Sequence, residues 1–95
     1  MGREQQLRAI AASDIRFSDA KTLYGVGHIT DFDRLIKHVK KTNVANALNI
    51  KTDRFEVLMT DPGQFKLLHI EYISILFDLP LDEMIKLVVK KIDLK

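Results

Sequence analysis

The chain contains no cysteine and no continuous run of about 18 apolar residues, the length that crosses a bilayer. The absence of cysteine excludes a disulfide framework and a thiolate metal site, and it fits a reducing compartment. Because no long apolar run exists, no segment is expected to span a membrane. The N-terminal segment Met-Gly-Arg-Glu-Gln-Gln also lacks the apolar core of a signal peptide. We therefore expect a cytoplasmic protein.

Signals of enzymatic chemistry are absent as well. His28, His38 and His69 are far apart in the sequence and have no paired metal-ligand spacing, which favours surface or half-buried histidines. The serines lack the glycines of a nucleophile elbow. The Gly25-Val-Gly27 segment is too short to be a phosphate-binding loop. The sequence thus predicts no catalytic residue, no metal site and no cofactor, and it gives no sign of a small-molecule ligand.

What the chain does have is enough apolar material for one compact core. It has 95 residues, of which 46% are hydrophobic, and a formal net charge of +2. The positive excess lies in residues 1–41, and its densest part is Arg34, Lys37, Lys40 and Lys41, with no acidic residue among them. Such a patch suits contact with phosphate, although on its own it is more often a solvated helix face.

Helical spacing of apolar residues recurs along the whole chain, and no stretch alternates convincingly as a strand. The first half predicts a helix over residues 3–12, a short helix over 19–24 with Ser18 as its cap, and a helix that starts at Thr30. That last start resembles a capping box, because Asp33 follows Thr30 after three positions. Lys40 and Lys41 are expected at its C-terminal end, where cations suit the helix dipole.

The second half predicts four more elements. Thr42 is the expected cap of one helix, and Thr52 is the expected cap of the next, which runs to about Met59. A turn at residues 61–63 and a break at residues 78–80 then delimit two further amphipathic helices. Together these elements predict one core, with the following members: Phe32, Leu35, Val44, Leu48, Phe55, Leu58, Leu68, Ile73, Leu76 and Met84.

Residues 42–58 are the most informative part of the chain, because they have the spacing of two short helices joined by a sharp turn. Ala45 is placed where the two helices cross, and a larger side chain there would push them apart. Asn49 occupies the position at which such turns usually carry glycine. Asparagine is the best substitute, because its short polar side chain tolerates a positive φ. A helix-turn-helix of this kind indicates DNA binding.

From Ile29 onward the chain resembles the lambda-repressor-like (Cro/CI-type) helix-turn-helix family. One segment, with Val44-Ala45, Leu48-Asn49-Ile50, Phe55 and Leu58, matches the family's motif position by position. The other, Phe77-Asp-Leu-Pro-Leu-Asp-Glu-Met84, is similar to the family's link between its last two helices. The resemblance implies an all-α DNA-binding domain of about five helices over residues 29–95. Residues 1–28 match nothing in the family and are expected to form an N-terminal helical extension.

The resemblance also implies a partner and a set of contact residues. The partner is double-stranded DNA, bound by a homodimer, and the function is that of a repressor-like transcriptional regulator. The expected base contacts lie at the start and on the outer face of the second motif helix, at Thr52, Asp53, Glu56 and Val57. The expected phosphate contacts are Lys40, Lys41, Asn43, Lys51 and Arg54.

A second interpretation stays open. The two carboxylates of the second motif helix, Asp53 and Glu56, disfavour an approach to phosphate, and the net charge is modest. Both features fit a protein-interaction module, or an antitoxin-like partner, on a helix-turn-helix scaffold without specific DNA binding.

Overall fold

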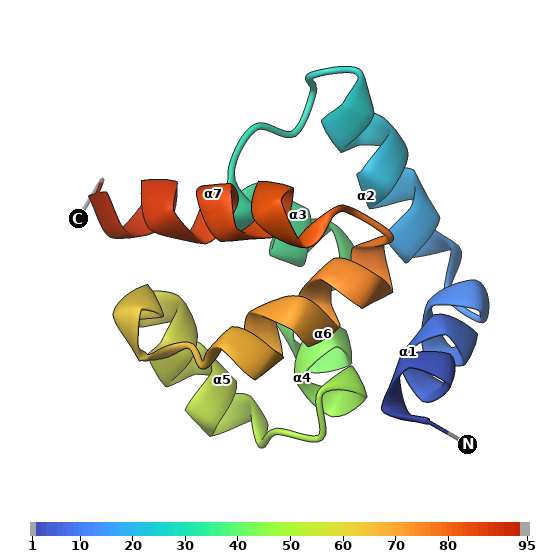
Figure 1. Ribbon diagram of the computed structural model, residues 1–95, viewed down its shortest axis with the longest axis horizontal. Coiled ribbons are helices and arrows are strands. Elements are labelled where there is room, and N and C mark those ends of the chain that lie inside the picture. Colours follow the sequence, from blue (N-terminus) through green and yellow to red (C-terminus); the bar gives the residue numbers. More distant parts are fainter. Residues whose placement is uncertain (1, 94–95) are drawn as a thin grey trace.

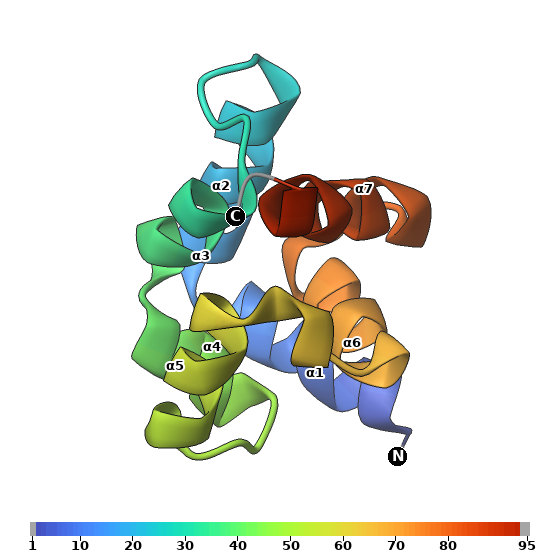
Figure 2. The same ribbon diagram turned by 90° about the vertical axis from the view of Figure 1, so that its left-hand side faces the viewer.

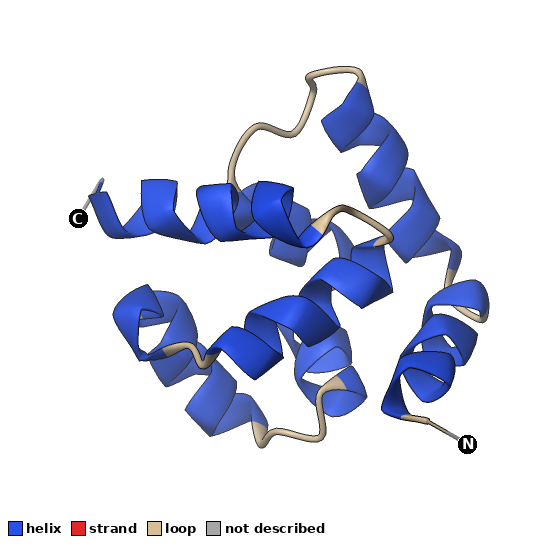
Figure 3. Ribbon diagram, viewed as in Figure 1, coloured by secondary structure: helices blue, strands red, loops and turns tan. Residues whose placement is uncertain are grey.

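The computed structural model describes residues 2–93, and within them the chain is entirely helical (Figures 1 and 3). Seven α-helices and one short 3-10 helix follow one another: α1 Arg3–Ala12, α2 Ile15–Gly25, α3 Phe32–Val39, α4 Lys41–Ala47, α5 Thr52–Thr60, η1 Pro62–Gln64, α6 Leu67–Phe77 and α7 Leu81–Asp93. The all-α prediction is confirmed, but the helices outnumber the five or so expected. None of the helices in the described part has the length and apolar character needed to cross a bilayer.

Two helices begin at caps other than those predicted, because a neighbouring aspartate supplies the better acceptor. Asp14 accepts a hydrogen bond from the backbone N–H of Arg16 at 3.1 Å, so α2 starts before Ser18. Asp31 likewise accepts from the backbone N–H of Arg34 at 2.8 Å, and Thr30 lies outside α3. A carboxylate satisfies a free backbone donor at least as well as a hydroxyl does.

The junction between α3 and α4 also differs from the prediction. Lys40 has φ 85° and ψ 135°, which ends α3 at Val39, so that α4 begins at Lys41 and contains Thr42. Lys40 and Lys41 are therefore not in the last turn of α3, and Thr42 is not a cap. The amide of Asn43 donates to the carbonyl oxygen of Val39 at 2.7 Å and satisfies one of the free carbonyls at the end of α3.

The core joins all the helices, and one predicted member is missing from it. Every residue of the predicted core is buried except Leu68, which is 52% exposed. The buried face of α6 follows the helical spacing of Ile70, Ile73 and Phe77, and Leu68 is off that face. The sequence pattern correctly predicted a helix in this segment, but it assigned Leu68 to the buried face, where the structure does not have it.

The N-terminal helices belong to the same core as the rest of the chain. Leu7 of α1 and Phe17 of α2 are buried, and the ring of Phe17 meets that of Phe77 edge-on, with centroids 5.2 Å apart. Helix α1 packs on α6. The boundary expected at residue 28 therefore does not separate two cores.

Replacement of Ala45 by leucine should lower the free energy of unfolding by about 1–3 kcal/mol, because Ala45 is fully buried and the added atoms overpack the site. Urea unfolding measures the change. Ala9→Leu is the matched control, since Ala9 is exposed on α1 and should tolerate leucine. A neutral Ala45→Leu variant would mean that α4 and α5 are not in close contact at this position.

Candidate nucleic-acid interface

The connection between α4 and α5 is a tight four-residue segment, residues 48–51. Asn49 has φ 59° within it, the left-handed conformation expected from the sequence. The backbone N–H of Ile50 donates to the carbonyl oxygen of Ala45 at 2.9 Å. Helix α5 thus turns back onto α4, and Figures 1 and 2 show it at the opposite end of the molecule from α2.

The inner face of α5 is anchored by aromatic packing. Phe55 and Leu58 are buried, and the ring of Phe55 meets the ring of Phe65 edge-on with centroids 6.1 Å apart. Phe65 in turn meets Phe32 of α3, at 5.7 Å. Phe65 follows η1 and is not part of the core predicted from the sequence. It lies next to a turn and belongs to no helical pattern of apolar residues.

The outer face of α5 carries the residues expected to contact bases. Asp53, Glu56 and Val57 are all exposed, and the apolar Val57 is 45% exposed. Thr52 is half-buried and is the first residue of the helix, while Lys51 holds the preceding position without a side-chain capping bond. The structure therefore brings Asp53, Glu56 and Val57 together on one surface, whereas the expected capping role of Thr52 is wrong.

An ion pair joins two residues that were expected to have separate roles. The Nζ of Lys41 lies 3.1 Å from the Oε2 of Glu56, and the two side chains are 32% and 50% exposed. Lys41 reaches from the start of α4 to the outer face of α5. Each charge of this pair is therefore largely compensated by the other.

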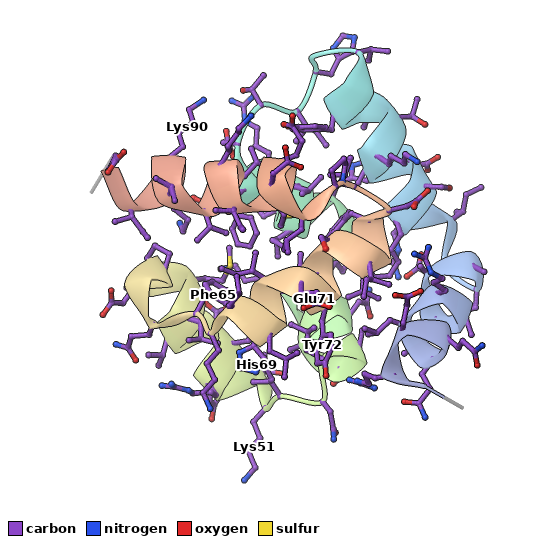
Figure 4. All side chains as sticks on the ribbon, in the orientation of Figure 1. Lys51, Phe65, His69, Glu71, Tyr72 and Lys90 are labelled. Carbon is purple, nitrogen blue, oxygen red and sulfur yellow. The ribbon has the colours of Figure 1, made fainter. Side chains whose placement is uncertain are left out.

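Arg54, Lys40 and Lys51, also expected to contact phosphate, differ in whether their side chains have a partner within the protein. Arg54 donates to the Oε1 of Gln64 at 3.4 Å, and Gln64 donates to the Oδ2 of Asp61 at 2.7 Å, so Arg54 is turned toward η1. Lys40 and Lys51 are exposed and have no carboxylate partner within residues 2–93. Figure 4 shows the side chain of Lys51 pointing away from the body of the molecule.

His69 is one of the three histidines that the sequence placed at the surface or half-buried. It lies on α6, is half-buried, and its Nδ1 has no hydrogen-bond partner among the described residues (Figure 4). Burial lowers the pKa of His69 below its usual value of 6.5, and the positive charges of Lys66 and Arg54 lower it further. The lowered pKa favours the neutral form of His69.

Groups of three or more histidine and acidic side chains that could hold a metal ion do not occur in the described part of the chain. Comparisons of the chain with protein-family models, curated proteins and solved structures found no match. Function must therefore be inferred from the chain's own residues and their arrangement.

The lowered pKa of His69 predicts a pH dependence of stability. Below pH 6.5 the unfolded chain takes up a proton at this histidine, whereas the folded chain takes it up only at lower pH. Because the unfolded state then binds more protons, the free energy of unfolding should fall as the pH drops below 6.5. In His69→Gln this fall should be smaller. Denaturant unfolding at a series of pH values measures it, and equal pH dependence in the two proteins would contradict the prediction.

Proposed function

We propose that the chain is a sequence-specific DNA-binding protein that inserts α5 into the major groove and acts as a repressor-like transcriptional regulator. One observation carries the proposal. Helix α5 is fixed by its buried inner face directly after a tight turn, and its outer face is left exposed with lysines beside it. An α-helix presented in this way fits the width of the major groove.

The outer face of α5 offers chemistry suited to base edges. The carboxylates of Asp53 and Glu56 can accept a hydrogen bond from the amino group of cytosine. Val57 can contact the methyl group of thymine, and Thr52 can bond to several base edges from the first turn. Val57 is apolar and 45% exposed, and it has acidic neighbours on α5. Such a side chain suits a surface that contacts bases, and it would add nothing to a surface that only neutralises phosphate.

Lys40 is the strongest candidate for a phosphate contact. Its φ of 85° is a conformation that glycine adopts more easily, and a non-glycine residue held there costs of order 1–3 kcal/mol. Strain of this kind concentrates at functional sites. Lys40 combines this strain with an exposed side chain at the start of α4, adjacent to the Lys41–Glu56 pair.

That pair removes part of the electrostatic objection to DNA binding, the part that comes from Glu56. A bare carboxylate on α5 would be repelled by phosphates, but the charge of Glu56 is balanced by Lys41 at 3.1 Å. The pair leaves α5 less repulsive than its sequence indicates, and it keeps Glu56 oriented. The resemblance further supports a homodimer, which would bind two half-sites about one helical turn apart.

A second candidate function is a protein-interaction module. The exposed Leu67 and Leu68 favour it, since they are 62% and 52% exposed in the first turn of α6. Asp53 adds a carboxylate on α5 with no cation partner in the described residues. Heparin retention and a gel shift with genomic fragments at low salt separate the two functions. A chain that shows neither supports the interaction module.

Lys40→Gly should weaken binding to all duplexes alike and lower the slope of log affinity against log salt by about 0.9, the effect of one lost phosphate contact. The variant should remain folded, with a free energy of unfolding raised by about 1 kcal/mol, because glycine relieves the strain at this φ. Lys41→Ala should lower the slope less, because the charge of Lys41 is already paired.

The controls for this experiment separate backbone from charge. Asn49→Gly makes the same kind of backbone change at another positive φ without a change of charge, and Lys86→Gln removes a charge from α7. Both should keep the wild-type slope. An unchanged slope in Lys40→Gly would remove Lys40 from the interface.

Glu56→Ala should change which base is preferred at one position of each half-site, by about 1–3 kcal/mol. Affinity for unrelated DNA should rise, because the substitution releases Lys41 for phosphate. Selection of binding sites from a random duplex pool measures the preference. Glu71→Ala removes the same charge from the exposed side of α6 and is the control. If Glu56→Ala and Asp53→Ala both select the wild-type motif, these residues do not read bases.

A further inference from the structure

Arg3 of α1 makes a long-range contact with the end of α4. Its Nη2 donates a hydrogen bond to the carbonyl oxygen of Ala47 at 2.8 Å, across 44 positions of sequence. The last carbonyls of a helix lack donors within the helix. Those of Val44, Ala45 and Asn46 accept backbone N–H groups of residues 48–50. The carbonyl of Ala47 accepts from Arg3 instead, directly before the connection that leads to α5.

The guanidinium of Arg3 is fixed from a second direction. It lies over the ring of Tyr72, on α6, at 5.4 Å from the ring centroid. A planar guanidinium can stack on a ring while its edge donates hydrogen bonds, which an ammonium group cannot do. One turn further along α1, Leu7 is completely buried in the core. Arg3 thus links α1, the end of α4 and α6. Figure 4 labels Tyr72 on α6.

This contact has no substitute nearby. Within the described residues, no other side chain forms a hydrogen bond with the last turn of α4 or with residues 48–51. Helix α4 has only seven residues, and the connection after it contains a left-handed residue. The direction in which α5 leaves α4 therefore depends on apolar packing, on the backbone hydrogen bonds of residues 48–50, on the Lys41–Glu56 ion pair and on this one side-chain hydrogen bond.

We propose that Arg3 is a positioning residue for DNA recognition: α1 acts through it to fix the end of α4 and so the orientation of α5. The proposal rests on the function proposed above. Arg3 itself does not contact phosphate, because its donors are directed to Ala47 and to Gln6, and its face lies on Tyr72. The N-terminal extension is on this account a part of the DNA-reading unit.

The test compares Arg3→Ala with Arg8→Ala in the full chain. Arg8 is on the same helix and carries the same charge, but it pairs at the surface with Glu4 and Asp78. Arg3→Ala should lose about tenfold in affinity for the selected duplex, the equivalent of one net hydrogen bond to a charged group. Its affinity for unrelated DNA and its salt slope should stay at wild-type values. Arg8→Ala should leave the ratio of specific to non-specific affinity unchanged.

Further measurements separate positioning from general stability. Binding is measured at a temperature at which each variant is fully folded, so a merely structural role would leave the ratio unchanged. Arg3→Lys keeps the charge and N–H donors but loses the planar stacking, and it should recover part of the affinity that Arg3→Ala loses. If Arg3→Ala does not fold, Arg3→Lys and Tyr72→Leu carry the test, and both should lose specific affinity. Backbone amides of residues 48–51 should exchange faster with solvent in Arg3→Ala, whether or not DNA is present.

The possible failures are distinguishable. Equal loss of specific and non-specific affinity, with a salt slope lowered by about 0.9, would make Arg3 a phosphate contact and overturn the proposal. Unchanged affinity and unchanged amide exchange would show that α1 has no positioning role. If the wild-type chain binds no duplex at all, the proposed function is wrong. The wild-type measurement alone gives that result, so it is distinct from a failure of the Arg3 proposal.

Discussion

The burial of the inner face of α5 is the interaction on which the candidate interface depends. The edge-on contacts Phe55–Phe65 and Phe65–Phe32 connect α5 to α3 across η1, and each aromatic pair of this kind contributes about 0.5–1.5 kcal/mol beyond its buried area. The fully buried Ala45 keeps α4 close enough for the short connection to close. Because a helix is rigid, fixing its inner face also fixes the direction of Glu56 and Val57 on the outer face.

Two of the charged side chains around α5 are engaged by other side chains, which limits their contact with phosphate. Lys41 is paired with Glu56, and Arg54 is turned toward Gln64. Among the expected phosphate contacts, this leaves Lys40 and Lys51 as the lysines that are exposed and have no carboxylate partner in residues 2–93. If α5 binds DNA as proposed, two unpaired lysines among these contacts should bind unrelated DNA only weakly at physiological salt. On the proposed function, discrimination between sequences would then come from the outer face of α5, and so from its orientation.

Features encoded in local spacing could be predicted from the sequence, and features that join distant segments could not. The bounds of α1, the turn at Asn49 and the burial of Ala45 follow from helical periodicity and turn chemistry. The predicted start of α3 is one residue early because Thr30 and Asp31 are adjacent, and spacing alone does not decide between them. The predicted start of α2 is one turn late because Asp14, and not Ser18, caps the helix. The Lys41–Glu56 pair spans 15 positions and the Arg3–Ala47 hydrogen bond spans 44, so neither contact can be predicted from a local sequence pattern.

Mapping the surface that a DNA duplex covers would test the proposed role of α5 most directly. Backbone amide NMR signals of the chain would be followed during titration with a duplex obtained by selection from a random pool. The account predicts that the largest changes occur in residues 52–57 and at Lys40, with smaller changes along the 48–51 connection. Changes confined to Leu67, Leu68 and the rest of α6, or no changes with any duplex, would contradict a major-groove role for α5.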